Sequence, residues 1–355
     1  MDIKDLGFTE EMKGFGIDHG LNSFETGRVV SEHRERYAVL TSKGLFDAEL
    51  LGNLRFTAES REDFPAVGDW VALSPYDEDK ALIHGIYPRH VVLSRQAVGK
   101  KGEKQIIATN IDVGLIVQSV NRDFNINRLE RYLTICYAAE IQPVVILSKT
   151  DLLEEEDLQQ VLDDIKSRIK EVEIIPVSNQ IEAGYQKVVE IIEQGKTYCL
   201  LGSSGVGKST LLNHVSGQEQ MQTGEISESI DRGKHVTTHR ELVVLANGGI
   251  LIDNPGMREV GVGDAAGGLE MTFDEIQELS QDCKYKDCTH VHEAGCAILE
   301  ALEEGELDQA SYENYLKMYK ERLHFETSAE DKKRKDKGFG KMMKQVKKVR
   351  KQNKY

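Results

Sequence analysis

From Asn110 onward, apolar residues gather in short runs that alternate with amphipathic stretches. Ile111–Val120 and Pro143–Leu147 are almost continuously apolar, which is typical of strands buried on both faces of a parallel sheet. Apolar residues at helical spacing predict helices over Asn127–Glu140, Glu154–Lys170 and Ile181–Glu193. Further strands are predicted over Val172–Val177, Lys196–Leu201, Glu241–Leu245 and Gly249–Asp253. This succession predicts an α/β domain with a mostly parallel sheet covered by helices.

The segment before this domain has a different pattern, made of short β-like runs separated by glycine, proline and acidic turns. The predicted strands are Arg28–Val30, Arg36–Leu40, Leu45–Leu51, Asp69–Leu73 and His90–Leu93. Five short strands in about 70 residues favour an OB-fold barrel, although an SH3-like barrel fits almost as well. Residues 1–23 carry no clear chemical signal. Past Gly268 the chain turns helical and acidic around a cluster of cysteines and histidines.

Composition and charge narrow the class of protein. The chain has 355 residues, 39% apolar and 30% charged, and no apolar run approaches the ~18 residues that cross a bilayer. We therefore expect a cytoplasmic protein without a membrane partner, since the N-terminus also lacks a signal-like segment. The formal charge of −15 is uneven, because residues 331–355 hold 12 Lys or Arg against 2 Asp. This basic tail could contact RNA, the alternative being a solvated tail that serves only solubility.

A phosphate-binding loop is the strongest chemical signal. The pattern G-x-x-x-x-G-K-S lies between a predicted buried strand and a helix start, the context that a P-loop requires. Its backbone N–H groups would surround phosphate oxygens, Lys208 would neutralise the β- and γ-phosphates, and the Ser209 hydroxyl would bind Mg²⁺. The predicted nucleotide-binding residues of this loop are Gly202, Ser203, Ser204, Gly205, Val206, Gly207, Lys208, Ser209 and Thr210.

Two later segments could complete a nucleotide switch. The buried strand Ile250–Asp253 ends in D-x-x-G, where Asp253 can hold Mg²⁺ through water and the Gly256 N–H can reach the γ-phosphate. Between it and the P-loop, Thr237 and Thr238 are candidates for a second hydroxyl on Mg²⁺. Ordinary turn or strand threonines are the alternative interpretation of that pair.

A base-reading element is predicted upstream of the P-loop. The strand Val144–Leu147 runs into Ser148-Lys149-Thr150-Asp151, which is similar to the [NT]-K-x-D element of GTPases. There Lys149 would lie along the purine face and Asp151 would bind its Watson–Crick edge. Ser178, at the next strand end, belongs to a segment similar to the loop that contacts the guanine oxygen. A helix N-cap is the alternative for S-K-T-D. The order is the reverse of Ras-like GTPases, but a circular permutation keeps all these strand ends on one sheet edge.

A metal-binding cluster is predicted near the C-terminus. Cys283-x4-Cys288-x-His290-x5-Cys296 offers three thiolates and an imidazole, a donor set that suits one tetrahedral structural Zn²⁺. His292 is a substitute ligand, and free reduced cysteines are the alternative. Cys136 and Cys199 lie in apolar surroundings and are predicted to be core residues.

Together these motifs resemble the RsgA (YjeQ/YloQ) family of circularly permuted GTPases. The resemblance rests on the permuted order, the loop GSSGVGKS, the strand end DNPG, the segment GKHVTTHREL, the barrel segment Phe64–Val71 and the cysteine spacing. It implies GTP hydrolysis stimulated by the small ribosomal subunit, rRNA binding and a role in late subunit maturation. It also implies His235 as the catalytic residue that positions water. His239 is the alternative residue, and an ordinary polar loop histidine is the alternative interpretation of His235. The chain departs from the family pattern at Ser148 and Val236.

We therefore expect a multi-domain chain. The expected parts are an N-terminal extension (1–23), an OB-fold-like barrel (24–100), a circularly permuted P-loop GTPase domain (101–265), a helical zinc-binding module (266–330) and a basic tail (331–355). The expected protein is a monomer that binds GTP or GDP with Mg²⁺, has His235 and Lys208 as catalytic residues, and couples hydrolysis to release from the subunit. The alternatives are a non-catalytic nucleotide-gated rRNA-binding protein and a P-loop ATPase or kinase.

Overall fold

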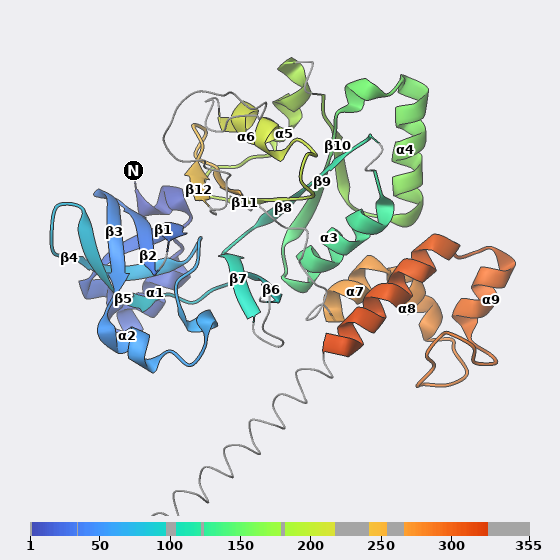
Figure 1. Cartoon of the computed structure of the whole chain (residues 1–355), viewed down its shortest axis with the longest axis horizontal. Coiled ribbons are helices and arrows are strands. Elements are labelled where there is room, and N and C mark those ends of the chain that lie inside the picture. The colour runs from blue at the N-terminus through green and yellow to red at the C-terminus, as the bar shows by residue number, and fades with distance from the viewer. Residues whose placement is uncertain are drawn as a thin grey trace, which may run out of the picture.

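The computed structural model has three parts in a row: an N-terminal barrel, a central sheet flanked by helices, and a C-terminal helical module (Figure 1). The structure describes residues 2–33, 35–96, 104–121, 124–178, 182–216, 241–253 and 266–325. The predicted fold class, with an OB-like barrel followed by an α/β P-loop domain and a cysteine- and histidine-bearing helical module, is confirmed.

The barrel is closed by five strands in the order β1-β2-β3-β5-β4, with β4 returning to pair with β1. Four neighbouring pairs are antiparallel, and β3 pairs with β5 in parallel. Alternate residues point inward and form an apolar core that includes Val29, Val39, Val71 and Ile83. The strands are β1 (Glu25–His33), β2 (Arg36–Thr41), β3 (Gly44–Leu50), β4 (Trp70–Pro75) and β5 (Lys80–Ile86), and the short helices α2 (Gly52–Thr57) and η3 (Arg61–Asp63) join β3 to β4.

The predicted fifth barrel strand is wrong. The barrel is completed by β5 (Lys80–Ile86), whereas the segment His90–Leu93 leads into β6 (Val92–Gln96), which pairs with β7 (Lys104–Thr109) in a separate two-stranded ribbon. β5 closes the barrel because it pairs with both β3 and β4. The apolar residues within one short segment do not show which distant strands it will pair with. The predicted end of the barrel domain, residue 100, falls between the two paired strands β6 and β7. All the domain boundaries given above stay predictions.

The N-terminal segment covers one side of the barrel. Its elements are η1 (Ile3–Leu6), α1 (Glu10–Asp18) and η2 (Leu21–Ser23). Leu6 and Met12 are buried against Trp70, and the Phe8 ring meets the Trp70 ring edge-on at 4.9 Å between centroids. Sparse apolar residues therefore give residues 1–23 a packing role that the sequence alone does not show.

The central sheet has the strand order β10-β9-β8-β11-β13-β12. The first five strands are parallel, as predicted, and β12 is antiparallel to β13 at the end next to the barrel. One residue pair, Ser31↔Glu241, continues the ladder from β12 into β1. The strands are β8 (Val113–Ser119), β9 (Gln142–Ser148), β10 (Glu173–Pro176), β11 (Thr197–Leu201), β12 (Glu241–Val244) and β13 (Ile250–Asp253).

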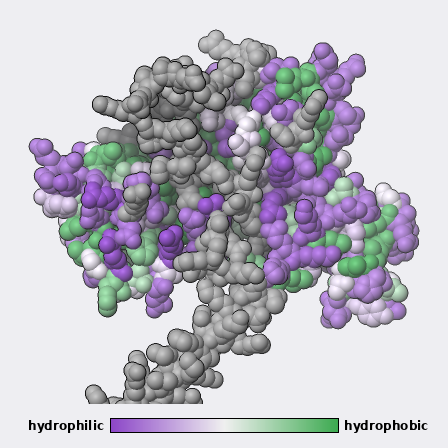
Figure 2. Space-filling model, in the orientation of Figure 1, coloured by the Kyte–Doolittle hydropathy of each residue, from purple (hydrophilic) through white to green (hydrophobic). Residues whose placement is uncertain are grey.

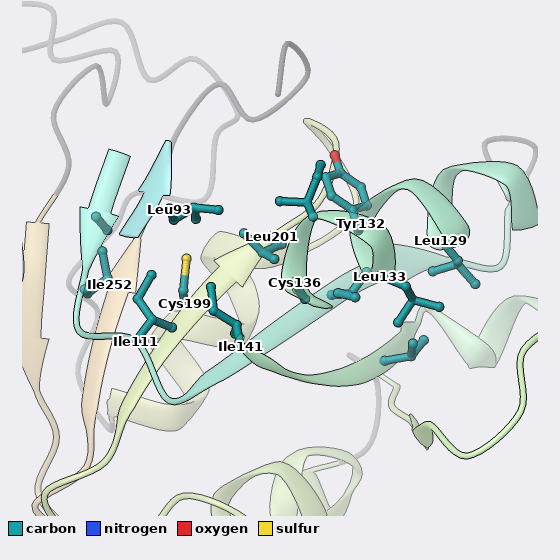
Figure 3. Packing of buried hydrophobic residues seen from close by; sticks show 14 of the residues in the cluster. Leu93, Ile111, Leu129, Tyr132, Leu133, Cys136, Ile141, Cys199, Leu201 and Ile252 are labelled. Carbon is teal, nitrogen blue, oxygen red and sulfur yellow. The ribbon is translucent and has the colours of Figure 1, made fainter. Parts of the chain in front are cut away.

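Helices cover both faces of this sheet. They are α3 (Ile126–Ala138), α4 (Glu155–Arg168), α5 (Gln186–Glu190) and α6 (Lys208–Ser216), with the single turns η4 (Thr150–Leu152) and η5 (Glu182–Tyr185). Figure 3 shows Leu133 and Cys136 of α3 among the buried residues that pack on β11. The predicted long helix over Ile181–Glu193 is divided into η5 and the short α5. Tyr198 explains its early end, since the Tyr198 hydroxyl donates to Ile191 O (2.6 Å) and accepts from the Glu193 N–H (2.9 Å).

A buried arginine joins the barrel to the central sheet. Arg28 of β1 is 1% exposed and donates to the carbonyl oxygens of Leu6, Gly68 and Asn110 and, at 2.8 Å, to Thr197 Oγ1 at the start of β11. Burial lowers the pKa of Arg28 to about 10, and the group stays charged at neutral pH. Four acceptors from separate segments fix the position of the barrel on the sheet.

The C-terminal module docks on α3. It contains α7 (Ala266–Thr272), α8 (Asp274–Ser280), α9 (Ala297–Glu304) and a last helix over residues 309–325. Helix α7 approaches α3 so closely that a Cβ on Gly268 would lie 2.1 Å from Thr134 O. Helix 309–325 adds a buried polar contact, in which Asn314 Nδ2 donates to Glu130 Oε2 at 2.5 Å and Arg168 binds the same carboxylate at 2.8 Å.

On the face drawn in Figure 2, hydrophilic and hydrophobic side chains of the described residues are interspersed. Within the described ranges, no helix combines the length and hydropathy that crossing a bilayer requires.

Candidate nucleotide and metal sites

The phosphate loop connects β11 to α6 at the carboxyl edge of the sheet. Gly202, Gly205 and Gly207 have φ angles of 141°, 81° and 100°, a region that side-chain-bearing residues rarely adopt. At Gly202 a Cβ would lie 2.3 Å from Val117 O of the neighbouring strand. The turn therefore requires glycine at all three positions, and packing on β8 requires it at Gly202 as well.

Lys208, the first residue of α6, folds back over this loop. Its ammonium donates to Gly202 O at 2.9 Å and Ser203 O at 2.6 Å. Ser209 is exposed, Thr210 follows it in the helix, and Ser204 and Gly205 are exposed at the tip of the loop. The cation and the helix N-terminus thus face the same concave backbone, an arrangement that favours a bound polyphosphate.

The upstream S-K-T-D segment directly contacts this loop. Ser148, 2% exposed at the end of β9, donates its Oγ to Val206 O at 2.6 Å. Lys149 extends its ammonium to Gly205 O at 2.8 Å, and its own backbone is left-handed with φ of 60°. The chain positions 148–149 and 205–206 are therefore neighbours in space, as the permuted-site prediction requires.

Asp151 is held at the same edge by the loop after β10. Ser178 Oγ donates to Asp151 Oδ1 at 2.7 Å, and Thr150 contacts Val177 O through both its N–H and its hydroxyl. Ser178 is buried whereas Asp151 is exposed. The carboxylate therefore has a fixed orientation and an open face, which suits an acceptor for a ligand's N–H groups.

Tyr185 adds a buried ring near this carboxylate. Burial, followed by the charge of Asp151, raises the pKa of Tyr185 to about 12, and the phenol is neutral at physiological pH. The sequence does not single out Tyr185, because an aromatic residue in a predicted amphipathic helix is ordinarily a core residue. Its ring partner, His214, lies 29 positions away.

The carboxylate predicted to bind Mg²⁺ lies at the end of the neighbouring strand. Asp253, 6% exposed, is the last residue of β13, and β13 pairs in parallel with β11 so that Asp253 is opposite Leu200. The predicted residues His235, Thr237, Thr238 and Gly256, and the alternative His239, lie outside the described residues. The roles assigned to them stay predictions.

The cysteine cluster assembles as the spacing predicts. The ligand atoms of Cys283, Cys288, His290 and Cys296 all lie within 4.8 Å of one another. The two thiols Cys283 and Cys296 are 3.9 Å apart, and each lies 3.6 Å from His290 Nδ1. A tetrahedral ion with Zn–S and Zn–N bonds of usual length would separate such atoms by about 3.8 and 3.6 Å. The four side chains therefore fit one tetrahedral metal ion; His292 is outside the cluster.

Two contacts hold the loop that carries His290. The Glu293 carboxylate accepts from the N–H groups of Val291 and His292 and from Thr289, and Tyr312 of helix 309–325 donates its hydroxyl to His290 O at 2.6 Å. Burial lowers the pKa of His290, which favours the neutral imidazole that binds metals. These outer contacts were not predicted, because Glu293 is one of many acidic residues in this segment.

Comparison with protein families agrees with this geometry. The RsgA GTPase model matches residues 86–263, which span the central sheet and every predicted nucleotide-binding residue. An ABC transporter model matches residues 185–350, which include the phosphate loop.

Curated relatives match over most of the chain. Small ribosomal subunit biogenesis GTPase RsgA 1 of Listeria innocua is 43% identical, with 83% of each chain covered. The RsgA 1 protein of Bacteroides thetaiotaomicron is 38% identical, with 91% of this chain and 90% of the relative covered. Among solved structures, YjeQ from Thermotoga maritima matches with a TM-score of 0.60 at 26% identity, covering 84% of this chain and 98% of that one. A circularly permuted GTPase, YloQ, shares the fold with a TM-score of 0.58. The chain belongs to the RsgA family of GTPases.

Proposed function

We propose that this chain is a Mg²⁺-dependent GTP hydrolase that binds the small ribosomal subunit and acts in its late maturation. The observation that carries the proposal is the contact between two distant segments: Ser148 and Lys149 bind the backbone of the phosphate loop, and Asp151 follows them at the same sheet edge. A P-loop kinase or ATPase has no need of such an element. The relatives' names, which specify a small-subunit biogenesis GTPase, support the same function.

Different residues of the site bind the phosphates, the guanine base, the magnesium ion and the attacking water. The loop Gly202–Thr210 and Lys208 bind the phosphates, while Asp151, Lys149 and Ser178 bind the guanine. Mg²⁺, when bound with GTP, neutralises the phosphate charge, and Ser209, Asp253 and Thr237 or Thr238 would hold it. His235 positions the attacking water by the resemblance to the RsgA motif. Gly256 responds to loss of the γ-phosphate.

The flanking parts supply the subunit contacts. Zn²⁺ is the proposed ion of the Cys283–Cys296 cluster, because three thiolates and an imidazole at tetrahedral separations match its preference. The basic tail 331–355 contacts rRNA phosphates. The protein acts as a monomer in the cytoplasm, where the small subunit matures, and the subunit stimulates hydrolysis, which is coupled to release.

The test is the rate of GTP hydrolysis by metal-replete protein with and without purified small ribosomal subunits. The proposal predicts a rate that rises with subunit concentration and is competed by GDP but not by ADP. Absent turnover under both conditions would favour the non-catalytic RNA-binding alternative, and competition by ADP would favour an ATPase. A second titration measures subunit affinity against salt: a chain ending at residue 330 should show a shallower salt dependence, because fewer counterions are released.

A further inference from the structure

Tyr185 and His214 join the base side of the nucleotide site to its phosphate side. The two rings are parallel within 13° and their centroids are 4.3 Å apart. Tyr185, which is 3% exposed, ends η5 in the loop after β10, whereas His214 belongs to α6, the helix that begins at Lys208. The turn beside Ser178 and the helix that follows the phosphate loop are therefore in direct ring contact.

Gly184 carries this contact onward to the Asp151 carboxylate. A Cβ at position 184 would lie 2.6 Å from Ser178 O and 3.1 Å from Ser178 N, and the two backbones are therefore packed more closely than any side chain allows. Ser178 in turn donates its Oγ to Asp151 Oδ1 at 2.7 Å. Contacts thus run in sequence from His214 through Tyr185, Gly184 and Ser178 to Asp151.

We propose that the Tyr185–His214 stack positions the Asp151 carboxylate for guanine nucleotides by fixing the loop after β10 to helix α6. The inference rests on the proposed function, because Asp151 discriminates bases only where a purine nucleotide binds. A carboxylate can accept hydrogen bonds from both N1–H and the 2-amino group of guanine, and two such bonds demand a precise orientation. Tyr185 acts through Asp151 and is a positioning residue.

The 2-amino group provides a readout that separates positioning from simple packing. Inosine diphosphate lacks this group but keeps N1–H and the phosphates. A carboxylate that is well positioned therefore binds GDP more tightly than inosine diphosphate, and a carboxylate that has become mobile loses part of this difference. A general loss of stability would weaken both nucleotides equally.

The experiment measures the affinities of the full-length protein for GDP and for inosine diphosphate by competition against a fluorescent guanine nucleotide. In Tyr185→Ala the ratio of the two affinities should fall about threefold or more, within what an aromatic pair contributes. Tyr185→Phe, which keeps the ring, should retain the wild-type ratio. Gly184→Ala should lower the ratio while both rings of the stack remain in the chain. Phe15→Ala is the matched control, because it removes another aromatic–histidine stack. The Phe15 ring of α1 and the ring of His19, which follows this helix, have centroids 3.8 Å apart.

Each outcome decides the inference. A falling ratio in Tyr185→Ala and Gly184→Ala, with Tyr185→Phe and Phe15→Ala unchanged, supports it. Equal weakening of both nucleotides means that the stack only packs the loop, and the inference is then wrong. If Tyr185→Ala fails to fold, Gly184→Ala and Tyr185→Leu decide in its place. If ADP competes better than GDP for the wild-type protein, the proposed function itself is wrong. If the wild type prefers GDP but the variants keep the wild-type ratio of GDP to inosine diphosphate affinity, only the positioning role of the stack is wrong.

Discussion

Replacing Arg168 by methionine tests how the C-terminal module is held on the nucleotide domain. The Glu130 carboxylate is 1% exposed and accepts from Arg168 Nε at 3.0 Å and from Arg168 Nη2 at 2.8 Å. Among the described residues of the C-terminal module, Asn314 of the last helix is the one that donates a hydrogen bond to this carboxylate. The substitution keeps most of the side-chain volume but leaves a buried carboxylate without its cation.

The magnitude follows from the burial of the pair. Removing one partner of a buried ion pair costs about 3–5 kcal/mol, and we expect about 3 kcal/mol because Asn314 still donates. Burial raises the pKa of Glu130 and Arg168 opposes that rise. Without Arg168 the folded-state pKa rises further above its unfolded value. The folded state then binds a proton that the unfolded state does not. The variant's loss in free energy of unfolding, relative to the wild type, therefore becomes smaller as pH falls toward the raised pKa.

The assay is urea unfolding followed by circular dichroism at pH 8 and pH 5.5, with metal present. Tryptophan fluorescence would report only unfolding of the barrel, since the single tryptophan, Trp70, is buried there. Arg131→Met is the control: its partner Glu321 is 36% exposed, and we expect a loss of about 1 kcal/mol or less. The double variant Glu130→Gln/Arg168→Met should regain stability. A loss below about 1 kcal/mol in Arg168→Met, or one that is independent of pH, would refute the reasoning.

Three further predictions concern the sites. Ser148→Ala should weaken GDP binding about tenfold in a fluorescent titration, because Val206 O loses a buried hydrogen bond. Ser148→Thr keeps the hydroxyl and should bind GDP as the wild type does. If Ser148→Ala and the wild type bind GDP equally well, this hydrogen bond does not determine nucleotide affinity. Chelation should remove one zinc ion and abolish hydrogen-exchange protection in residues 283–304 but not in the barrel; retained protection would mean that the cluster folds without metal. His235→Ala should keep GTP affinity and lose most turnover, and unchanged turnover would remove it from the mechanism.

The parts that the sequence predicts well are those set by local pattern. The strands β8, β9 and β11 are near-continuous apolar runs, and the P-loop follows β11 with its glycines at the positions that need positive φ. The Cys283–Cys296 spacing likewise places four donors within reach of one ion. In each case one short segment contains both the pattern and its physical reason.

The parts that the sequence does not predict depend on partners far away in the chain. β5 closes the barrel only through β3 and β4, and Arg28 is explained only by acceptors as distant as Thr197. The hydrogen bond between Glu130 of α3 and Asn314 of the last helix joins residues 184 positions apart in the chain. A buried charged residue has the same local appearance as an exposed one, and its partners become evident only once the fold brings them together.

The most direct test of the account is base selectivity at Asp151. The 2-amino group of guanine donates to a carboxylate, whereas xanthine has a carbonyl there that accepts from an amide. Competition binding of GDP and xanthosine diphosphate should show a GDP preference in the wild-type protein and a xanthosine diphosphate preference in Asp151→Asn. If Asp151→Asn keeps the wild-type preference for GDP, the segment that contacts the phosphate loop does not read the base.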